Sequence, residues 1–340
     1  MSDILRSVGL DVGTTSTQMI FSELTVENKA SGFAVPEMEI ARRDIRYRSP
    51  VYFTPLLDES HVDAGALREL VAEEYRKAGI RRESVDTGAI IITGETSRKE
   101  NARAALDALS DFAGEFVVAT AGPDLESVLA AKGAGAVDYS QRTGKTVLHM
   151  DIGGGTTDIA VLSMNGVAVS SSLKVAGNYF DEMIARYVRR QHGVVIGQVT
   201  AENVKIQIGQ VYPRDEERSM NVKGRDFKTG MPKVITLTST EIFEVLRRPA
   251  RMITDEVLAV LEQTSPELVS DISENGITLT GGCSQIWGMD LLIAERTGIG
   301  CVLADDPDAC TAYGAGKSLA WINHMQEGPI NIARKRAMRG

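Results

Sequence analysis

The stretch that decides the fold runs from Val147 to Leu162 and reads VLHMDIGGGTTDIAVL. Two apolar segments flank a turn rich in glycine and threonine, which is typical of two β-strands joined by a tight turn. A shorter form of the pattern occupies Val8–Phe21, VGLDVGTTSTQMIF, where Asp11 stands in the place of Asp151. The repeated use of one strand–turn–strand unit predicts a duplicated fold with two lobes facing a cleft.

Further strand and helix patterns follow each of these turns. After the first turn the sequence predicts a helix over 64–77, a buried strand over 88–94, a helix over 102–112, a strand over 116–119 and a helix over 125–132. After the second it predicts helices over 181–191 and 200–208, a polar hairpin over 217–233, a long helix starting at a capping box of Thr238 and Glu241, a strand over 276–280, and helices from 288 and over 312–322. This alternation favours an α/β fold with largely buried sheets.

Composition narrows the class of protein. The 340 residues include 37 Lys and Arg against 46 Asp and Glu, and the net charge of −9 disfavours nucleic acid as a partner. The three cysteines have no Cys-x-x-Cys spacing, so the sequence indicates neither a disulfide framework nor a zinc site. No apolar stretch approaches the length of a membrane span. We therefore expect a cytoplasmic protein with at most peripheral contact with a membrane.

Both turns have the chemistry of a phosphate site. Glycine lets backbone N–H groups approach a phosphate, and threonine hydroxyls donate to its oxygens. Asp11 and Asp151 would repel a polyphosphate unless a divalent cation stood between them, and Mg²⁺ held largely through water fits that need. One such turn alone is typical of a structural hairpin. Two of them, each between apolar strands in opposite halves of the chain, favour phosphate binding.

Two further segments fit the nucleoside part of a nucleotide. In Thr280–Ser284, TGGCS, glycines between a strand and a helix would let a nucleoside lie against the backbone, although such turns also occur as plain structure. Glu202 and Lys205 lie one helical turn apart and could bracket a ribose and an adenine, although the spacing alone is typical of a surface ion pair. The inference of a nucleotide site rests on the presence of all four segments in one chain and on their order along it.

These four segments resemble the signatures of the actin-like ATPases, a superfamily that includes sugar kinases and heat-shock chaperones. The resemblance implies an α/β, actin-like (ribonuclease H-like) duplicated two-lobed fold with a nucleotide cleft and two inserted subdomains. The expected domains are a first lobe over 1–145 with an insert over about 29–86, a second lobe over 146–308 with an insert over about 179–237, and a C-terminal helix over 309–340 that returns to the first lobe and ends in a basic tail.

The two halves resemble different members of that superfamily. Residues 8–140 resemble EutA, the reactivating factor of ethanolamine ammonia-lyase, in the segments Gly9–Gln18, Ser49–Pro55 and Ala89–Thr96. Residues 147–323 resemble MreB, the bacterial actin that organises cell shape, in the segments Asp151–Thr157, Phe180–Glu182, Pro266–Glu274 and Leu279–Gly282. A natural hybrid and a constructed chimera would both show this division.

The resemblance implies ATP and Mg²⁺ as cofactors and assigns their residues. Asp11 and Asp151 would act around Mg²⁺ and the attacking water. The phosphates would be held by Gly13, Thr14, Thr15, Ser16, Gly153, Gly154, Gly155, Thr156 and Thr157. The ribose and adenine would be held by Glu202 and Lys205, with Gly177 and Asn203 completing the set, and the adenosine by Gly281, Gly282, Cys283, Ser284 and Gln285. Cys283 stands where the related pattern has glycine.

One departure concerns hydrolysis. MreB-like proteins have a Glu-Glu-Pro segment whose carboxylate positions the hydrolytic water, and the comparable stretch here, Ala121–Glu126, has Gly122 before the proline. Asp124 or Glu126 could substitute, and we count Glu126 with Asp11, Asp151 and Thr156 as candidate catalytic residues. The alternative for either carboxylate is stabilisation at a helix N-terminus by the helix dipole. We expect slow hydrolysis of ATP or none.

The resemblance implies two functions. The first is a nucleotide-dependent filament-forming cytoskeletal protein of MreB type, which self-associates. The second is a reactivating chaperone of EutA type. A small-molecule kinase is disfavoured because the sequence offers no acidic base for a substrate hydroxyl. The basic segments Arg42–Arg48 and Arg334–Arg339 are typical of solvated surface. The choice between ATP and GTP stays open.

Overall fold

The computed structural model describes residues 2–13, 16–28, 38–58, 61–92, 101, 105, 109, 116–120, 123–164 and 166–318. It divides into two compact units, one of Met1–Gly133 with Ala309–Gly340 and one of Ala134–Asp308. The predicted border near residue 145 differs from this division, because helix α4 (Ala136–Thr143) groups with the second unit. The predicted helix over 102–112 lies almost entirely outside the described residues, and the tail Arg334–Arg339 lies wholly outside them.

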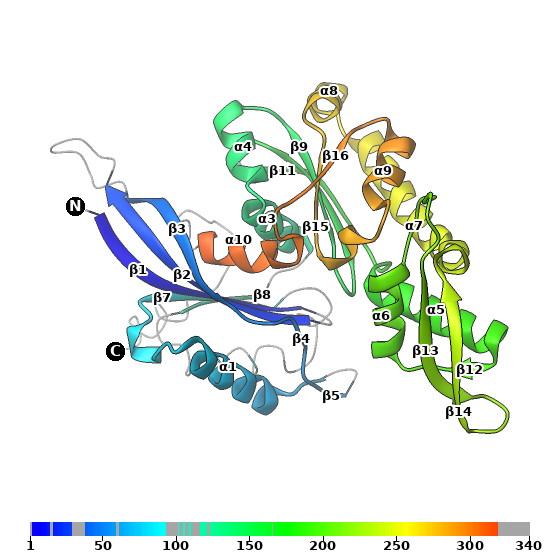
Figure 1. The fold of residues 1–340 in the computed structure, drawn as a ribbon. Coiled ribbons are helices and arrows are strands. Elements are labelled where there is room, and N and C mark those ends of the chain that lie inside the picture. The colour runs from blue at the N-terminus through cyan, green and yellow to red at the C-terminus, as the bar shows by residue number, and fades with distance from the viewer. Residues whose placement is uncertain are drawn as a thin grey trace. The chain divides into compact units, whose positions relative to one another are not determined.

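The first unit is built on one mixed sheet (Figure 1). Its strands run in the order β3-β2-β1-β7-β8, with β1, β2 and β3 antiparallel and β1, β7 and β8 parallel. Their bounds are β1 Ser2–Val12, β2 Ser16–Asn28, β3 Met38–Arg48, β7 Thr87–Ile92 and β8 Phe116–Thr120. The short strands are β4 Tyr52–Phe53, β5 Leu56–Asp58 and β6 His61–Val62. The helical elements are α1 Ala64–Ala78, η1 Arg82–Ser84, α3 Pro123–Gly133, η4 Pro307–Ala309, which crosses the border between the units, and α10 Cys310–Ser318.

Helix α1 shows how the sequence forms this unit. The Asp63 side chain accepts a hydrogen bond from the Ala66 N–H and caps the helix, and Gly79 ends it with φ of 66°, a conformation that glycine adopts without strain. Leu67, Val71 and Tyr75 recur at helical spacing on its buried face. They pack in one cluster with residues of β1, β2 and β7, so the helix covers the sheet.

The second unit repeats the sheet of the first. Its strands run in the order β11-β10-β9-β15-β16, again with three antiparallel strands followed by parallel ones. Their bounds are β9 Val147–Ile152, β10 Thr157–Ser163, β11 Gly166–Leu173, β15 Ile277–Thr280 and β16 Cys301–Leu303. The helices are α4, α5 Gly177–His192, α6 Gln198–Ile208, α7 Ser239–Gln263, α8 Pro266–Asn275, η3 Gly282–Gln285 and α9 Met289–Thr297. The shared strand order confirms the duplicated actin-like fold.

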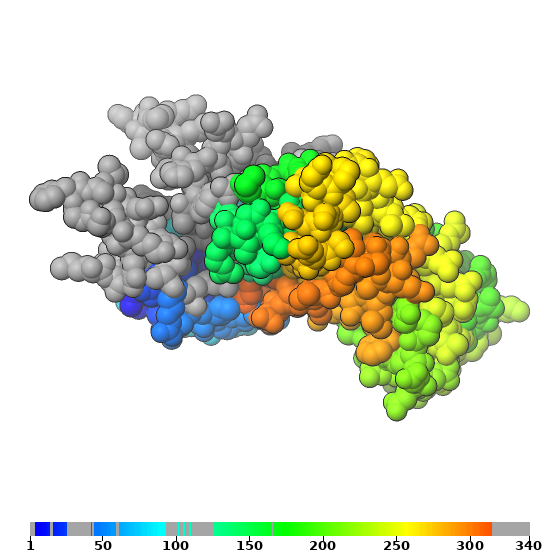
Figure 2. Space-filling view, turned by 90° about the horizontal axis from the view of Figure 1, so that it is seen from above, coloured from blue at the N-terminus to red at the C-terminus, as the bar shows by residue number. Residues whose placement is uncertain are grey.

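A small second sheet extends the second unit. It consists of β12 Val194–Val195, β13 Ser219–Asp226 and β14 Pro232–Thr238, and the β13–β14 hairpin projects away from the main sheet (Figures 1 and 2). Among the described residues, no helix combines the length and the apolar character needed to cross a bilayer.

Strand β3 differs from the sequence-based expectation. Residues 38–48 were predicted to lie within an inserted subdomain, but β3 pairs with β2 in the main sheet. The basic residues of this segment lie on the strand, and Arg46 pairs with Glu23 on the neighbouring strand β2. The sequence pattern did not predict this strand, because arginines occupy positions where a β-strand usually has apolar side chains.

The long helix α7 begins at the predicted capping box. Thr238 Oγ1 accepts from the Glu241 N–H at 3.3 Å, and Glu241 Oε2 accepts from the Thr238 N–H at 2.9 Å. We expect Thr238→Ala to destabilise the second unit by about 1 kcal/mol, because the Glu241 N–H loses its side-chain acceptor at the start of the helix. Urea unfolding followed by circular dichroism measures it. The control is Thr236→Ala on the exposed face of β14, and equal losses in the two variants would contradict the capping role.

Candidate functional site

The two glycine–threonine turns are closed by the same backbone hydrogen bond. The Gly13 N–H donates to the Ser16 carbonyl at 2.8 Å, and the Gly153 N–H donates to the Thr156 carbonyl at 3.0 Å. Asp11 lies opposite Gln18 in the sheet register. The predicted residues Thr14 and Thr15 lie outside the described residues. Each unit therefore presents one such turn between its first two strands.

The turn of the second unit is fixed against the start of α5. The Gly177 N–H donates to the Gly153 carbonyl at 3.1 Å, and the Asn178 N–H donates to the Gly154 carbonyl at 2.7 Å. The Thr157 hydroxyl donates to the Val175 carbonyl at 2.7 Å. The first two hydrogen bonds are accepted by carbonyl groups of the turn. Contacts within the protein therefore fix the backbone conformation of the turn.

Two carboxylates face each other beside this turn. Asp151 and Asp158 are directly opposite in the register of β9 and β10, and both are buried. Asp158 also accepts a hydrogen bond from the Thr156 hydroxyl at 2.8 Å. Like charges opposite one another in a sheet repel, so this arrangement favours a positive partner nearby.

The Gly281–Gln285 segment lies against Asp151. Strand β15 ends at Thr280, and Gly281 then adopts φ of 83°. A Cβ atom on Gly281 would lie 2.3 Å from the Ile152 carbonyl oxygen and 2.4 Å from Asp151 Oδ1, so only glycine fits there. The Ser284 hydroxyl donates to the Gly281 carbonyl at 2.6 Å, while Gly282 and Gln285 are exposed. Residues 281–285 thus form a turn with a buried and an exposed side.

Lys205 is buried and does not form the surface ion pair that its spacing suggested. Its ammonium lies 2.9 Å from Asp181 Oδ1 and donates to the Gly177 carbonyl at 3.3 Å. Burial raises the pKa of Asp181 to about 6, against the opposing effect of the Lys205 ammonium. Glu202 is half-buried and Asn203 is exposed on the same helix, α6. Lys205 therefore joins α6 to α5 beneath the turn.

Cys283 completes this cluster. A Cβ atom on Gly177 would lie 2.6 Å from Cys283 Sγ and 3.1 Å from Lys205 Nζ. Burial raises the pKa of the Cys283 thiol to about 11, so the thiol stays protonated at neutral pH. It acts as a small packing group rather than a nucleophile.

The structure thus brings together most of the predicted residues of the second unit. Those that share this site are Asp151, Gly153, Gly154, Thr156, Thr157, Gly177, Lys205, Gly281, Cys283 and Ser284. The predicted residues Asp11, Gly13, Ser16 and Glu126 belong to the first unit, where Glu126 is the fourth residue of α3. Gly122 lies outside the described residues.

Sequence reasoning missed Asp181. The residue lies on the buried stripe of α5, in step with Gly177, Ile184 and Val188. A carboxylate at an apolar position of an amphipathic helix signals a buried partner, and this signal could have located the ion pair.

We expect Gly177→Ala to weaken about tenfold the nucleotide binding that we propose for this site, because the added methyl group must displace Cys283 Sγ from the cluster. The displaced atom belongs to a side chain, so Cys283→Ala in the same protein should restore most of the loss. Titration with a fluorescent ATP analogue measures both variants. A double variant as weak as Gly177→Ala alone would show that Cys283 is not the obstacle.

Comparisons with known proteins agree with this architecture. A family model described as Ethanolamine utilisation protein EutA matches residues 3–304. The cell shape-determining protein MreB of Escherichia coli is 49% identical over 198 residues, which is 58% of this chain and 56% of that protein. The ethanolamine ammonia-lyase reactivase EutA of Salmonella typhimurium is 37% identical over 289 residues, 83% of this chain and 56% of that protein. The chain thus spans little more than half the length of these curated relatives.

Solved structures share the fold. MreB5 of Spiroplasma citri bound to AMPPNP has a TM-score of 0.71 at 28% identity, with 94% of this chain and 97% of that chain covered. A MamK double helical filament has a TM-score of 0.64 at 20% identity, with 93% and 98% covered. The fold and the matches define a member of the actin-like ATPase superfamily.

Within that superfamily the chain belongs to the EutA family, and it is related to MreB as well. The predicted resemblance to both is confirmed. The EutA model extends through both units, beyond the range of residues 8–140 in which the resemblance was first found.

Proposed function

We propose that the chain binds ATP with Mg²⁺ and assembles into filaments in a nucleotide-dependent manner, as a cytoskeletal protein of MreB type. The observation that supports it best is the cradle of the second unit, in which Gly281 approaches Asp151 too closely for any side chain and the Gly153–Thr157 turn is bonded to the start of α5. Glycines that expose backbone beside a carboxylate fit a phosphate and its cation. The solved MreB5 structure contains AMPPNP, which is consistent with this use of the fold.

Different residues of the cradle would contact the phosphates, the Mg²⁺ ion and the nucleoside. The turn over 153–157 would hold phosphate oxygens through backbone N–H groups and the Thr156 hydroxyl. Asp151 would hold Mg²⁺ largely through water, because in the described part of the chain no three metal-ligating side chains gather. Gly281–Gln285, Gly177, Glu202 and Asn203 would contact the nucleoside, while Lys205 positions α5 and α6. Asp11, Gly13, Ser16 and Glu126 remain predicted contributors from the first unit.

The hydrolytic step is proposed to be slow. Gly122 stands where the resembling segment of MreB has a glutamate. Without that carboxylate the attacking water loses a positioning group, a loss typically worth 10²–10⁴-fold in rate. Binding and release of nucleotide would then govern assembly more than turnover does.

An exposed apolar surface supports self-association. Phe227, Met231 and Val234 on the β13–β14 hairpin are 55%, 67% and 58% exposed. Apolar side chains gathered on one projecting hairpin favour contact with another protein surface. A second copy of the chain is the partner that an assembling protein requires, and MamK is a filament in its solved structure.

A second candidate is a nucleotide-driven reactivating chaperone of EutA type. The match of the EutA family model to residues 3–304 favours it, since it includes the nucleotide cradle. In this case the nucleotide would change the affinity for a lyase rather than for another copy of the chain.

Sedimentation and negative-stain microscopy distinguish the two candidates. The purified chain is tested with ATP and Mg²⁺, with ADP and without nucleotide, over a range of protein concentration. Filaments above a critical concentration that require nucleotide are the expected result. A protein that binds ATP but stays monomeric or dimeric at every concentration would overturn the filament proposal and favour the chaperone. A protein that fails to bind ATP would overturn both.

A further inference from the structure

In both units the segment after the third strand of the sheet is bonded to the glycine–threonine turn. In the first unit this segment is residues 49–55, which follow β3 and contain β4. In the second unit it is residues 174–178, which follow β11 and lead into α5. Strand β4 also pairs with the first two residues of β2, directly after the turn. Each turn is therefore held by a segment at the same place in the duplicated fold.

The registers of the two sheets show which residues of the turns correspond. In each sheet the last residue of the first strand pairs with the residue after the turn, Val12 with Thr17 and Ile152 with Thr157. Four residues lie between the paired residues in each case. Gly13 of the first unit therefore corresponds to the first glycine of the second turn.

The carbonyl groups of these two glycines accept hydrogen bonds from different kinds of donor. The Gly153 carbonyl accepts from the Gly177 N–H at 3.1 Å. The Gly13 carbonyl accepts from the Thr54 hydroxyl at 2.8 Å. Thr54 is 6% exposed, so solvent has little access to replace it as the donor. A side chain thus does in the first unit what a backbone N–H does in the second.

A second hydroxyl fixes the orientation of Thr54. The Oγ1 atoms of Thr17 and Thr54 are 3.0 Å apart, and Thr17 is fully buried. A hydroxyl has one proton, and Thr54 donates its proton to Gly13, so Thr17 is the donor to Thr54. The corresponding residue of the second unit, Thr157, likewise bonds to the segment after the third strand, at the Val175 carbonyl.

Helix α1 holds β4 in place. The Glu74 carboxylate, 1% exposed, accepts hydrogen bonds from the Tyr52 hydroxyl at 2.6 Å, the Tyr47 hydroxyl at 2.8 Å and the Lys77 ammonium at 3.0 Å. Burial alone would raise the pKa of Glu74, but these three hydrogen bonds lower it, so the group stays a carboxylate at neutral pH. Thr54 follows Tyr52 by two residues and is therefore part of an anchored segment.

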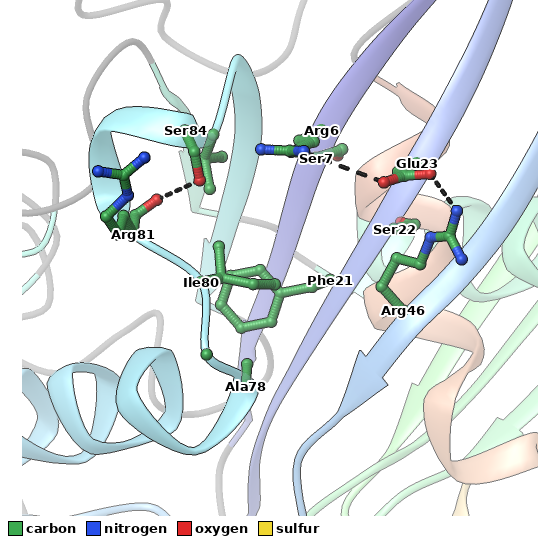
Figure 3. A pocket seen from close by; sticks show the side chains of 12 residues that line it. Arg6, Ser7, Phe21, Ser22, Glu23, Arg46, Ala78, Ile80, Arg81 and Ser84 are labelled. Carbon is green, nitrogen blue, oxygen red and sulfur yellow. Dashed lines mark hydrogen bonds and ion pairs between the residues drawn. The ribbon is translucent and has the colours of Figure 1, made fainter.

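The first unit also contains a cavity of about 380 Å³, lined by residues of β1, β2, β3 and the segment that joins α1 to η1 (Figure 3). Arg6, Arg46 and Arg81 line it and would attract a phosphate, but so does the carboxylate of Glu23, which is paired with Arg46. None of its lining residues belongs to the turn or to residues 49–55. The cavity is the competing phosphate site in this unit, and an arginine variant tests it.

We propose that Thr54 positions the phosphate turn of the first unit, as the counterpart of Gly177 in the second. A carbonyl oxygen and a phosphate oxygen are both acceptors and cannot bond to each other. The Thr54 hydroxyl occupies the Gly13 carbonyl and keeps it from facing a bound phosphate. The contribution of Thr54 to nucleotide binding rests on the proposed function, whereas its hold on the turn does not.

Hydrogen–deuterium exchange of the chain without nucleotide tests the hold on the turn. Thr54→Val keeps the shape of the side chain and removes the donor, so exchange in a peptide covering residues 10–19 should become about fivefold faster. Thr54→Ala lacks the same hydroxyl and should show the same change, whereas Thr54→Ser keeps the hydroxyl and should match wild type. Wild-type exchange in the valine and alanine variants would overturn the proposal, whatever the chain binds.

Titration with ATP and with adenosine tests the contribution to nucleotide binding. Thr54→Val should weaken ATP about fivefold in calorimetric titration, and Thr54→Ser should not. Adenosine has no phosphate, so its binding at millimolar concentration, followed by saturation-transfer NMR, should be equal in Thr54→Val and wild type. Equal losses for ATP and adenosine would indicate general damage to the fold and would refute a role in phosphate binding.

Two control variants complete the design. Thr87→Val, at a half-buried position at the start of β7, should leave ATP binding unchanged. Arg81→Gln should do the same, and weaker ATP binding in this variant with none in Thr54→Val would place the phosphate in the cavity and overturn the assignment. A wild-type chain that binds no ATP would refute the proposed function, and the exchange experiment would still decide whether Thr54 holds the turn.

Discussion

Gly281→Ala is expected to abolish measurable nucleotide binding and to destabilise the second unit by about 3–5 kcal/mol. The added Cβ atom would lie 2.3 Å from the Ile152 carbonyl oxygen and 2.4 Å from Asp151 Oδ1, and the φ of 83° strains any L side chain. One contact is with backbone at the end of β9, so it cannot be relieved by a rotamer change. Urea unfolding and titration with a fluorescent ATP analogue measure the two effects.

The adjacent glycine provides a matched control. A Cβ atom on Gly282 would meet nothing within 4 Å, and the residue is exposed. Gly282→Ala should therefore change stability by less than about 1 kcal/mol. If Gly282→Ala destabilised the second unit as much as Gly281→Ala, the whole segment would be sensitive for a reason other than the close approach of Gly281 to Asp151.

Lys205→Met is expected to destabilise the second unit by about 3–5 kcal/mol at pH 8, because it leaves the Asp181 carboxylate buried without its cation. Asp181→Asn in the same protein should recover much of the loss, since no buried charge then remains. Lys223→Met, at an exposed position of β13, is the matched control and should change little. A double variant that is as unstable as Lys205→Met would contradict the ion-pair explanation.

The same variant should show a distinct dependence on pH. Burial raises the pKa of Asp181 to about 6, above the 3.8 of a free aspartate. Between these values the folded state binds more protons than the unfolded state, so this group favours folding at low pH and loses that contribution as pH rises through about 6. Removal of Lys205 raises the pKa further. The stability gap between Lys205→Met and wild type should therefore be smaller at pH 5 than at pH 8, as measured by urea unfolding at both.

Sequence patterns predicted those structural features that are formed by residues close together in the sequence. The turns at Asp11 and Asp151 could be found because glycine and threonine at a strand end specify both backbone geometry and chemistry. The capping box at Thr238 was equally visible. Strand β3 was not, because arginines occupy positions where a strand usually shows apolar side chains.

Features that need distant residues to meet were harder to predict. The spacing of Glu202 and Lys205 suggested a surface pair, but the fold places Lys205 against Asp181 on another helix. The cavity of the first unit joins residues from β1, β2, β3 and the end of α1, and no single segment reveals it. Sequence reasoning thus pointed to the glycines that lie around Asp151 but not to the ion pair between α5 and α6.

Helix α10 has a consequence for how the chain is made. It belongs to the first unit, where Ala312 and Tyr313 pack against Ile20 of β2 and Gly314 leaves room for the Leu129 carbonyl of α3. A ribosome adds about 5–20 residues per second, so the whole second unit emerges before α10 does. The second unit can therefore reach its native state first, while the surface of β2 and α3 that awaits α10 stays open on the nascent chain. The first unit is therefore synthesised first but finishes folding last. Release of the chain before α10 is made would leave the first unit incomplete and the second unit complete.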